Sequence, residues 1–289
     1  MAVPPSDRAV LSGGDRLVLD KATKENFPVA LRILPGRHRR HLLAVYIFAR
    51  TVDDIGDLAP PGQRAAELAG VEADVRRLYD GGAPDHAHSA VRGLAGTVAE
   101  CGVPMQPFLD LIRANQQDQA VTRYDTFDDL LGYCRLSANP VGRIVLHVFG
   151  AYSAERAALS DSVCTGLQLA EHWQDVAEDL RAGRIYLPVA DMRDFGCTED
   201  DLAARQAPPA VRRLIEFEVQ RAATLIASGA PLIGTLRGAA RLAVAGYVAG
   251  GRAALTAIAA ADYDVLAATR RPRRGRIAAE LALAYARAR

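Results

Sequence analysis

Hydrophobic residues recur at spacings of three and four along most of the chain, which places them on one face of an α-helix. No stretch shows the sustained alternation of apolar and polar residues that predicts a β-strand. Proline and glycine, which commonly end helices, interrupt the pattern at several places. These interruptions lie at residues 35–36, 60–62, 81–84, 102–104, 139–140, 183, 208–209 and 229–231. They divide the chain into about ten predicted helices, and an all-α bundle is the simplest architecture for them.

The chain is expected to form a single domain over residues 1–289, because its composition shows no strong shift along this length. Residues 1–20 lack the basic start and the continuous apolar core of a signal peptide, and they are predicted to be a flexible lead-in. The stretch 242–261 is strongly apolar, but Arg252 and three glycines lie within it. This composition favours a buried helix over a membrane span.

The charges of the chain nearly balance, with 35 basic against 34 acidic side chains and a net charge of +1. The chain as a whole therefore has no electrostatic preference for nucleic acid. Its four cysteines lie far apart and form no C-x-x-C pair, which argues against a zinc site and against a disulfide framework. A reducing, cytoplasmic location is expected.

Two helical segments each lead an apolar face into a pair of aspartates. In the segment LLAVYIFARTVDDIGD this face ends in Asp53 and Asp57. In the segment QLAEHWQDVAEDLRAGRIYLP, Asp175 and Asp179 lie one helical turn apart. Like charges at this spacing destabilise an isolated helix by roughly 0.2–0.5 kcal/mol, so a positive partner is expected.

Two interpretations of these acids are open. One is a solvated acidic face that Arg181 and Arg184 neutralise. The other is a divalent cation, because Mg²⁺ prefers oxygen ligands and is commonly held by one or two carboxylates together with substrate phosphates. Two carboxylate pairs across a cavity would then hold metals that take up a diphosphate, and Arg50, Arg184 and Lys24 are placed to help stabilise its negative charge.

The doubled acidic motif, TVDDIGD followed by QLAEHWQDVAEDLRAGRIYLP, resembles the squalene and phytoene synthase family of isoprenoid synthases. The likeness extends from ENFPVALRILP near the start of the chain to ADYDV at 261–265. It implies an all-α helical bundle around a central cavity, with Mg²⁺ and a prenyl diphosphate substrate held between acidic motifs on opposite walls. The metal-binding residues that it implies are Asp53, Asp57, Asp175 and Asp179, with Asp54 and Glu178 in support.

Further positions match family residues that lie near the diphosphate. These are Tyr46, Arg50, Gln168, Arg184 and Tyr186, together with Lys24 and Asn26, where the family often has serines. Three departures make this pocket less positive than is usual in the family: Glu171 replaces an asparagine, and Gln174 and Gln116 stand where arginines are common. Glu171 is interpreted either as an additional metal ligand or as the mark of a weakened site. Retention of the four aspartates favours activity.

The block YCRLSANPVGRIVLHVFG, residues 133–150, distinguishes branches of the family. Leu136 stands where squalene and phytoene synthases have a second tyrosine, and Asn139 stands where they have a glycine. This form resembles the bacterial hydroxysqualene synthase branch of hopanoid biosynthesis. The resemblance implies Mg²⁺-dependent conversion of presqualene diphosphate and water to hydroxysqualene with release of diphosphate, and no NADPH is expected. Asn139 is hypothesised to orient the attacking water.

Two other functions remain open. A sister synthase that condenses two prenyl diphosphates head-to-head, to presqualene diphosphate or to a squalene- or phytoene-type product, would carry the same acidic motifs. A catalytically silent isoprenoid-binding or assembly protein is the alternative from another class. Such a protein would have little reason to keep four mutually repelling aspartates.

The segment 270–289 begins with the basic run RRPRRGR. A solvated segment is one interpretation of this run. The other is attraction to anionic lipid headgroups, worth about 1 kcal/mol per basic residue near the surface, which would suit an enzyme with a membrane-soluble substrate and product. The expected location is the cytoplasm, where the protein could contact the inner face of the membrane peripherally. A partner synthase that supplies the substrate is also compatible with the sequence.

Overall fold

The computed structural model describes residues 34–82, 87–269 and 271–287, and within these ranges the chain forms helices and no β-strand. The all-α class predicted from the hydrophobic pattern is therefore confirmed. The helices are α3 (Gly36–Leu58), α4 (Pro61–Tyr79), α5 (Ser89–Cys101), α6 (Gln106–Gln117), α7 (Phe127–Ser137), α8 (Asn139–Val148), α9 (Ala154–Gln174), α10 (Val176–Arg181), α11 (Val189–Asp194), α12 (Glu199–Leu202), α13 (Pro209–Gly229), α14 (Leu232–Thr235), α15 (Gly238–Ala260) and α16 (Arg274–Arg287).

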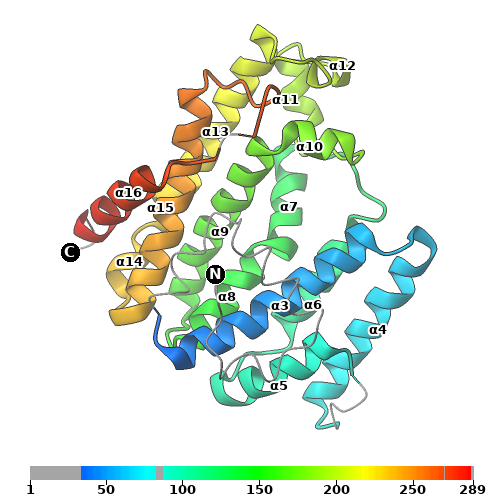
Figure 1. The fold of residues 1–289 in the computed structure, drawn as a ribbon, viewed down its shortest axis with the longest axis vertical. Helices are drawn as coiled ribbons and strands as arrows, with labels where there is room; N and C mark the ends of the chain where they lie inside the picture. The colour runs from blue at the N-terminus through cyan, green and yellow to red at the C-terminus, as the bar shows by residue number, and fades with distance from the viewer. Residues whose placement is uncertain (1–33, 83–86, 270, 288–289) are drawn as a thin grey trace.

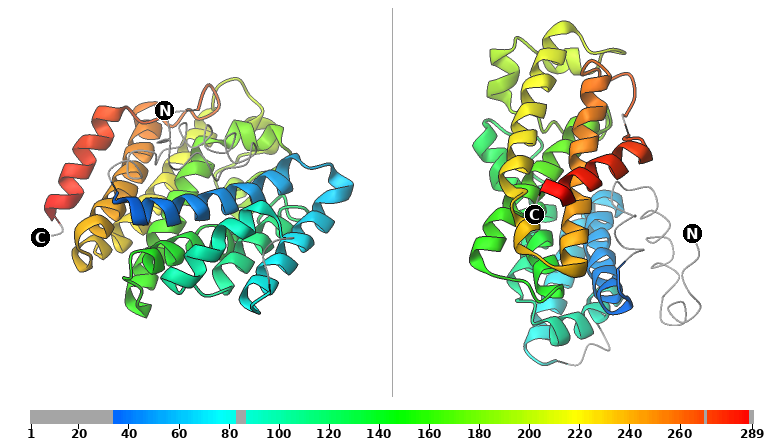
Figure 2. Two further views of the ribbon diagram at one scale, coloured as in Figure 1. Left: turned by 60° about the horizontal axis from the view of Figure 1, so that its bottom comes forward. Right: turned by 90° about the vertical axis from the view of Figure 1, so that its left-hand side faces the viewer.

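Helix α9 runs through the middle of the molecule, where it packs against α13, α15, α7 and α8 (Figure 1). Helix α3 packs against α4, α5 and α6 and also contacts α8. Helix α16 lies across the outer side of α15 (Figure 2). The two long helices that carry the acidic motifs, α3 and α9, thus belong to different parts of the bundle, and α8 contacts both of them.

The predicted interruptions that fall within the described residues coincide with helix ends. Pro35 precedes the first residue of α3, Pro209 is the first residue of α13, and Pro140 lies in the first turn of α8, where a missing N–H costs little. The helices outnumber the prediction because α10, α11, α12 and α14 have only four to six residues each. Elements of this length carry too few residues to show a helical period.

One predicted helix is divided at the second acidic motif. Helix α9 ends at Gln174, Asp175 caps it with φ −108° and ψ 14°, and α10 begins at Val176. The N–H of Asp179 nevertheless donates to the carbonyl of Asp175 at 2.8 Å, so the two acids stay one turn apart. The acid pair therefore sits on a bend in the chain and not within a continuous helix.

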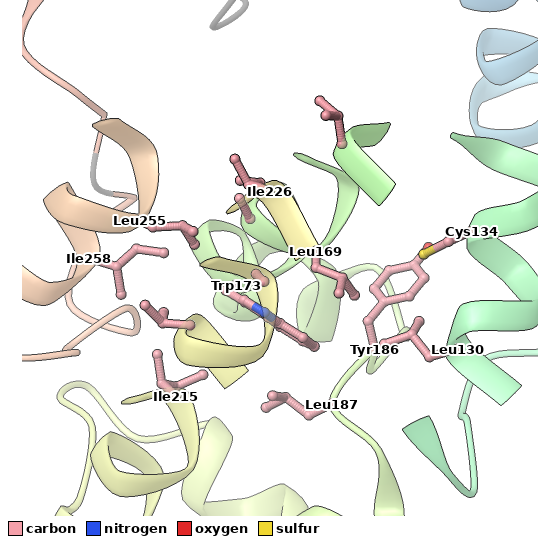
Figure 3. Close-up of a cluster of buried hydrophobic side chains, with 14 of the residues drawn as sticks. Leu130, Cys134, Leu169, Trp173, Tyr186, Leu187, Ile215, Ile226, Leu255 and Ile258 are labelled. Carbon is pink, nitrogen blue, oxygen red and sulfur yellow. The ribbon is translucent and has the colours of Figure 1, made fainter. Parts of the chain in front are cut away.

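Two clusters of buried hydrophobic side chains form the core. The Trp173 cluster joins α7, α9, α13 and α15 around the fully buried indole of Trp173 (Figure 3). The Phe48 cluster joins α3, α4, α5, α6 and α8, and the Phe48 ring meets Phe108 edge-on at 5.3 Å. The predicted buried helix is confirmed as α15: it is long and apolar enough to span a membrane, but 61% of its most apolar window is buried inside the protein.

Two glycines allow α9 and α13 to approach each other closely. A Cβ added to Gly229 would lie 2.5 Å from the carbonyl oxygen of Leu159, and one added to Gly166 would lie 3.0 Å from the carbonyl oxygen of Ala222. Because both obstacles are backbone atoms, neither can move aside without shifting a helix. The position of α9, which carries the second acidic motif, therefore depends on these two residues.

Candidate active site

A cavity of about 620 Å³ lies between α3 and α9, and this volume is in the range of small-molecule sites. Each of the two helices lines it with one face. On α3 the lining begins with Leu42 and ends with Asp57, and on α9 it begins with Ser160 and continues to Asp175 at the helix end. On both helices the apolar residues come first and the acids last. The cavity therefore has an acidic end and an apolar chamber.

The first acidic pair lies against α6. Asn115 donates a hydrogen bond from Nδ2 to Oδ1 of Asp53 at 3.0 Å. Gly56 permits this contact, because a Cβ at that position would lie 2.5 Å from Oδ1 of Asn115. Burial raises the pKa of Asp53 to about 6, although the hydrogen bond from Asn115 opposes the rise. The carboxyl of Asp57 is more exposed and pairs with Arg184.

The second acidic pair is also electrostatically unfavourable in the protein alone. Burial and the neighbouring charge of Asp175 raise the pKa of Asp179 to about 7. Burial and the charge of Glu178 raise the pKa of Asp175, and the positive charge of Arg271 acts in the opposite direction. Arg271, from the basic C-terminal run, thus influences the acidic end of the cavity. Raised carboxyl pKa values mark a place where a bound cation would relieve repulsion.

Arg184 connects the two acidic motifs. Its guanidinium pairs with Asp57 on α3, and its Nη1 lies 3.9 Å from Oδ2 of Asp118 at the end of α6. The hydroxyl of Tyr133 donates to the same Oδ2 at 2.8 Å, and burial raises the pKa of Asp118 to about 6. The segment that carries Arg184 is held in place from the backbone, because the N–H of Ile185 donates to the carbonyl of Thr122 at 3.0 Å.

His172 belongs to the cavity wall and lies one helical turn after Gln168 on α9. Its ring stacks on Tyr186 with centroids 3.7 Å apart. The amide nitrogen of Gln168 lies 3.1 Å from Nε2 of His172 and donates to it, so this ring nitrogen is an acceptor. Burial lowers the pKa of His172 to about 3, and the ring is therefore neutral.

The predicted metal ligands separate into two groups. Five of them line the cavity: Asp53, Asp57, Glu171, Asp175 and Asp179. Asp54 and Glu178 do not line it: Asp54 pairs with Arg50 at 3.0 Å and Glu178 is exposed to solvent, and their supporting role toward a metal stays a prediction.

The carboxylates of Asp53 and Asp179 fit Mg²⁺ chemically: they are hard oxygen donors, and burial raises the pKa of each, so a bound cation would stabilise the ionised form. Within the described residues no three acidic, histidine or cysteine side chains converge on one point. Such an arrangement suits an ion whose remaining ligands come from water and substrate phosphates.

The predicted substrate residues are distributed as follows. Tyr46, Arg50 and Gln168 line the cavity. Arg184 contacts the acidic end through Asp57, and Tyr186 lies behind His172. Lys24 and Asn26 lie outside the described residues.

Asn139 lies within the cavity wall, and its role in orienting the attacking water stays a prediction. Its side chain is 5% exposed and does not line the cavity, and its Oδ1 accepts a hydrogen bond from Thr165 at 2.9 Å. Asn139 thus joins α8 to α9 within the wall.

The sequence of the chain is similar to a family model and to proteins of that family. A family model described as squalene/phytoene synthase matches residues 21–278. The hydroxysqualene synthase of Rhodopseudomonas palustris is 36% identical over 216 residues, which cover 74% of this chain and 72% of that protein.

Solved structures show the same fold. The crystal structure of the squalene synthase HpnC from Alicyclobacillus acidocaldarius superposes with a TM-score of 0.78 at 42% identity, covering 87% of this chain and 95% of that one. A dehydrosqualene synthase in complex with a ligand superposes with a TM-score of 0.84 at 24% identity, covering 95% of this chain and 96% of that one. The expected helical isoprenoid synthase fold is confirmed, and the chain belongs to the squalene/phytoene synthase family.

Proposed function

We propose that the protein converts presqualene diphosphate and water to hydroxysqualene, with release of diphosphate, in a Mg²⁺-dependent reaction of squalene and hopanoid biosynthesis. The observation that carries this proposal is a single cavity with carboxylates at one end and an apolar chamber at the other. A substrate with a diphosphate head and long hydrocarbon chains matches both parts. The similarity to the hydroxysqualene synthase of R. palustris supports this choice of substrate within the family.

At the acidic end the carboxylates of Asp53, Asp57, Asp175 and Asp179 would hold Mg²⁺. When bound, Mg²⁺ supplies positive charge that stabilises the departing diphosphate. Arg50 lies at the same end of the cavity and would contribute its charge to the diphosphate as well. Arg184 neutralises Asp57 in part and holds α3 against the segment that follows the second motif.

In the chamber the aliphatic walls would surround the two hydrocarbon chains and exclude bulk water. Loss of diphosphate leaves a carbocation, and a lone pair of one water molecule forms the new carbon–oxygen bond. A proton of that water then passes to the released diphosphate, which is a base in the same cavity. The sequence of bonds requires no hydride, so NADPH is not needed.

A second candidate is the head-to-head condensation of two prenyl diphosphates to presqualene diphosphate, from which a hydride donor such as NADPH would be needed to form squalene. It is favoured by the 42% identity to a structure described as a squalene synthase. Both reactions begin with metal-assisted loss of diphosphate, so the acidic end serves either. A silent binding protein is disfavoured, because mutually repelling acids at the cavity are costly without a cation.

Product analysis by mass spectrometry distinguishes these candidates. The purified protein is given Mg²⁺ without NADPH, and presqualene diphosphate and farnesyl diphosphate are offered in separate reactions. We expect an alcohol of squalene mass plus water from presqualene diphosphate, and we expect EDTA to abolish it. Presqualene diphosphate formed from farnesyl diphosphate would instead establish the condensation. Turnover of neither substrate would contradict both enzymatic functions.

We also propose that the basic run 270–276 contacts anionic lipid at the inner face of the membrane, where a partner synthase would deliver the substrate. Arg271 is unsuitable for testing this, because its charge acts on Asp175. Arg273 is exposed, and Arg276 pairs with Glu280 at 3.0 Å on the outer helix α16. Replacing Arg273 and Arg276 by glutamine should weaken sedimentation with phosphatidylglycerol vesicles while turnover in detergent is retained. Unchanged sedimentation would contradict the contact.

A further inference from the structure

Ser137 is a polar residue in the wall of the cavity that the predicted site does not use. It is the last residue of α7 and one of the residues that line the cavity. Its Oγ is buried and has no hydrogen-bond partner among the residues that the structure describes. A buried hydroxyl without a partner is destabilising, so a partner is expected in the working protein. Rotation about the Cα–Cβ bond can turn the Ser137 hydroxyl toward a molecule in the cavity, where it can form a hydrogen bond.

The depth of Ser137 in the cavity follows from its neighbours. Tyr133, one turn earlier on α7, has its ring 6.2 Å from that of His172. Asn139, two residues later, hydrogen-bonds to Thr165. Ser137 therefore lies between the levels of His172 and Thr165 on α9, close to the level of Gln168.

This level is the boundary between the acidic end and the chamber. With a rise of 1.5 Å per residue, Gln168 lies about 10 Å from Asp175 along α9, and Ser160 lies about 22 Å from it. A diphosphate held at the acids occupies the first part of this distance. The carbon from which it departs would then lie near Ser137, far from Ser160.

We infer that Ser137 positions the water molecule that captures the carbocation, an inference that rests on the proposed function. The hydroxyl of Ser137 would accept a hydrogen bond from this water and leave an oxygen lone pair directed at the cation. The water oxygen forms the bond to carbon, and its second proton passes to the released diphosphate. Without an oriented water, the cation instead loses a proton from a neighbouring carbon to the same diphosphate and becomes a hydrocarbon.

The test measures what fraction of the carbocation is captured by water as alcohol and what fraction loses a proton to become hydrocarbon. Wild type and Ser137→Ala are given presqualene diphosphate and Mg²⁺, and the rate of diphosphate release is measured together with the ratio of alcohol to hydrocarbon. We expect diphosphate release within about threefold of wild type, because Ser137 does not touch the carboxylates. The ratio of alcohol to hydrocarbon should fall about fivefold or more, the effect of removing one hydrogen bond of ordinary strength.

Ser160→Ala is the matched control, because it removes a serine hydroxyl from the same cavity at the deeper level. The Ser160 hydroxyl already contacts Sγ of Cys164 at 3.9 Å, and its loss should leave the ratio unchanged. Ser137→Thr retains a hydroxyl and should restore most of the alcohol. If Ser137→Ala does not fold, Ser137→Gly removes the same group and is measured in its place.

The outcomes separate this role from the proposed function. A wild-type protein that forms no alcohol from presqualene diphosphate refutes the function and with it the role of Ser137. Alcohol from wild type with an unchanged ratio in Ser137→Ala refutes the role of Ser137 alone. An equal loss of alcohol in Ser160→Ala also refutes it, because capture would then depend on the general polarity of the chamber.

Discussion

Glu218 of α13 offers a sharp test of the electrostatics inside the protein. Its side chain is completely buried, and Arg221 donates to its Oε1 at 3.2 Å. The same guanidinium donates to Asp191 at 2.5 Å, so two carboxyl groups share one positive charge. Oε2 of Glu218 accepts no hydrogen bond from the described residues. Burial raises the pKa of Glu218 to about 8; Arg221 opposes the rise, and the hydrogen bond with Asp191 adds to it.

The sign of the pH dependence follows from this shift. The ordinary pKa of 4.5 applies to the unfolded chain, and the value of about 8 applies to the folded protein. The folded state therefore binds the proton more tightly, so its stabilisation is complete below pH 4.5 and is lost as the pH rises toward 8. At about 1.4 kcal/mol for each pH unit, the loss between pH 5 and pH 8 is on the order of 4 kcal/mol.

Glu218→Gln is the informative substitution, because the amide keeps an acceptor for Arg221 and a donor toward Asp191 without titrating. Urea unfolding of both proteins at several pH values gives the free energy of unfolding. We expect wild type to lose stability relative to the variant by about 4 kcal/mol from pH 5 to pH 8. Other buried acids titrate in both proteins and cancel in the difference.

Glu216→Gln serves as the control for this measurement. Glu216 lies two residues earlier on the same helix and is only partly buried. This variant shows how far the loss of a charge at a less buried position of the same helix changes the pH dependence. A difference between wild type and Glu218→Gln that stays constant from pH 5 to pH 8 would refute the reasoning, because Glu218 would then be ionised throughout and neutralised by Arg221.

Three further substitutions test the site and its support. Asp175→Asn should lower turnover at least about 100-fold by removing a carboxylate from the acidic end, and a loss below tenfold in a product assay would argue against a metal role. Arg184→Ala should raise KM for the diphosphate substrate more than Arg184→Lys does, because lysine keeps the charge opposite Asp57; equal effects would show that charge is unimportant there. Gly229→Ala should lower the free energy of unfolding by about 1–3 kcal/mol, since its Cβ would meet the Leu159 carbonyl, and an unchanged Tm would contradict that packing.

The sequence predicts the parts of this protein that depend on local spacing. The helices, their proline and glycine boundaries, and the placement of Asp53 and Asp57 on one face follow from the period of the α-helix alone. The facing arrangement of the two acidic motifs is suggested by the chemistry of a metal-held diphosphate and by the family resemblance, and not by local spacing. No local rule brings residues of α3 and α9 to one cavity.

The features that the sequence missed are set by contacts between distant segments. Asp118 and Tyr133 meet Arg184 only because the end of α6, helix α7 and the segment after α10 converge. His172 stacks on Tyr186, from the segment after α10, with ring centroids 3.7 Å apart. Asn139 carries a suitable amide, but its hydrogen bond to Thr165 turns that amide into the wall.

The two hydrophobic clusters meet the same chamber from opposite sides, the Phe48 cluster through residues such as Leu42 and Val45 and the Trp173 cluster through Val163 and Val244. A hydrocarbon ligand in the chamber would therefore touch both halves of the core and link their unfolding. A ligand at 100 times its Kd that binds only the folded state adds about 2.7 kcal/mol to stability. A substitution in the chamber wall is therefore under two selective constraints during evolution. It affects which product forms, and it affects how cooperatively the two halves of the core unfold.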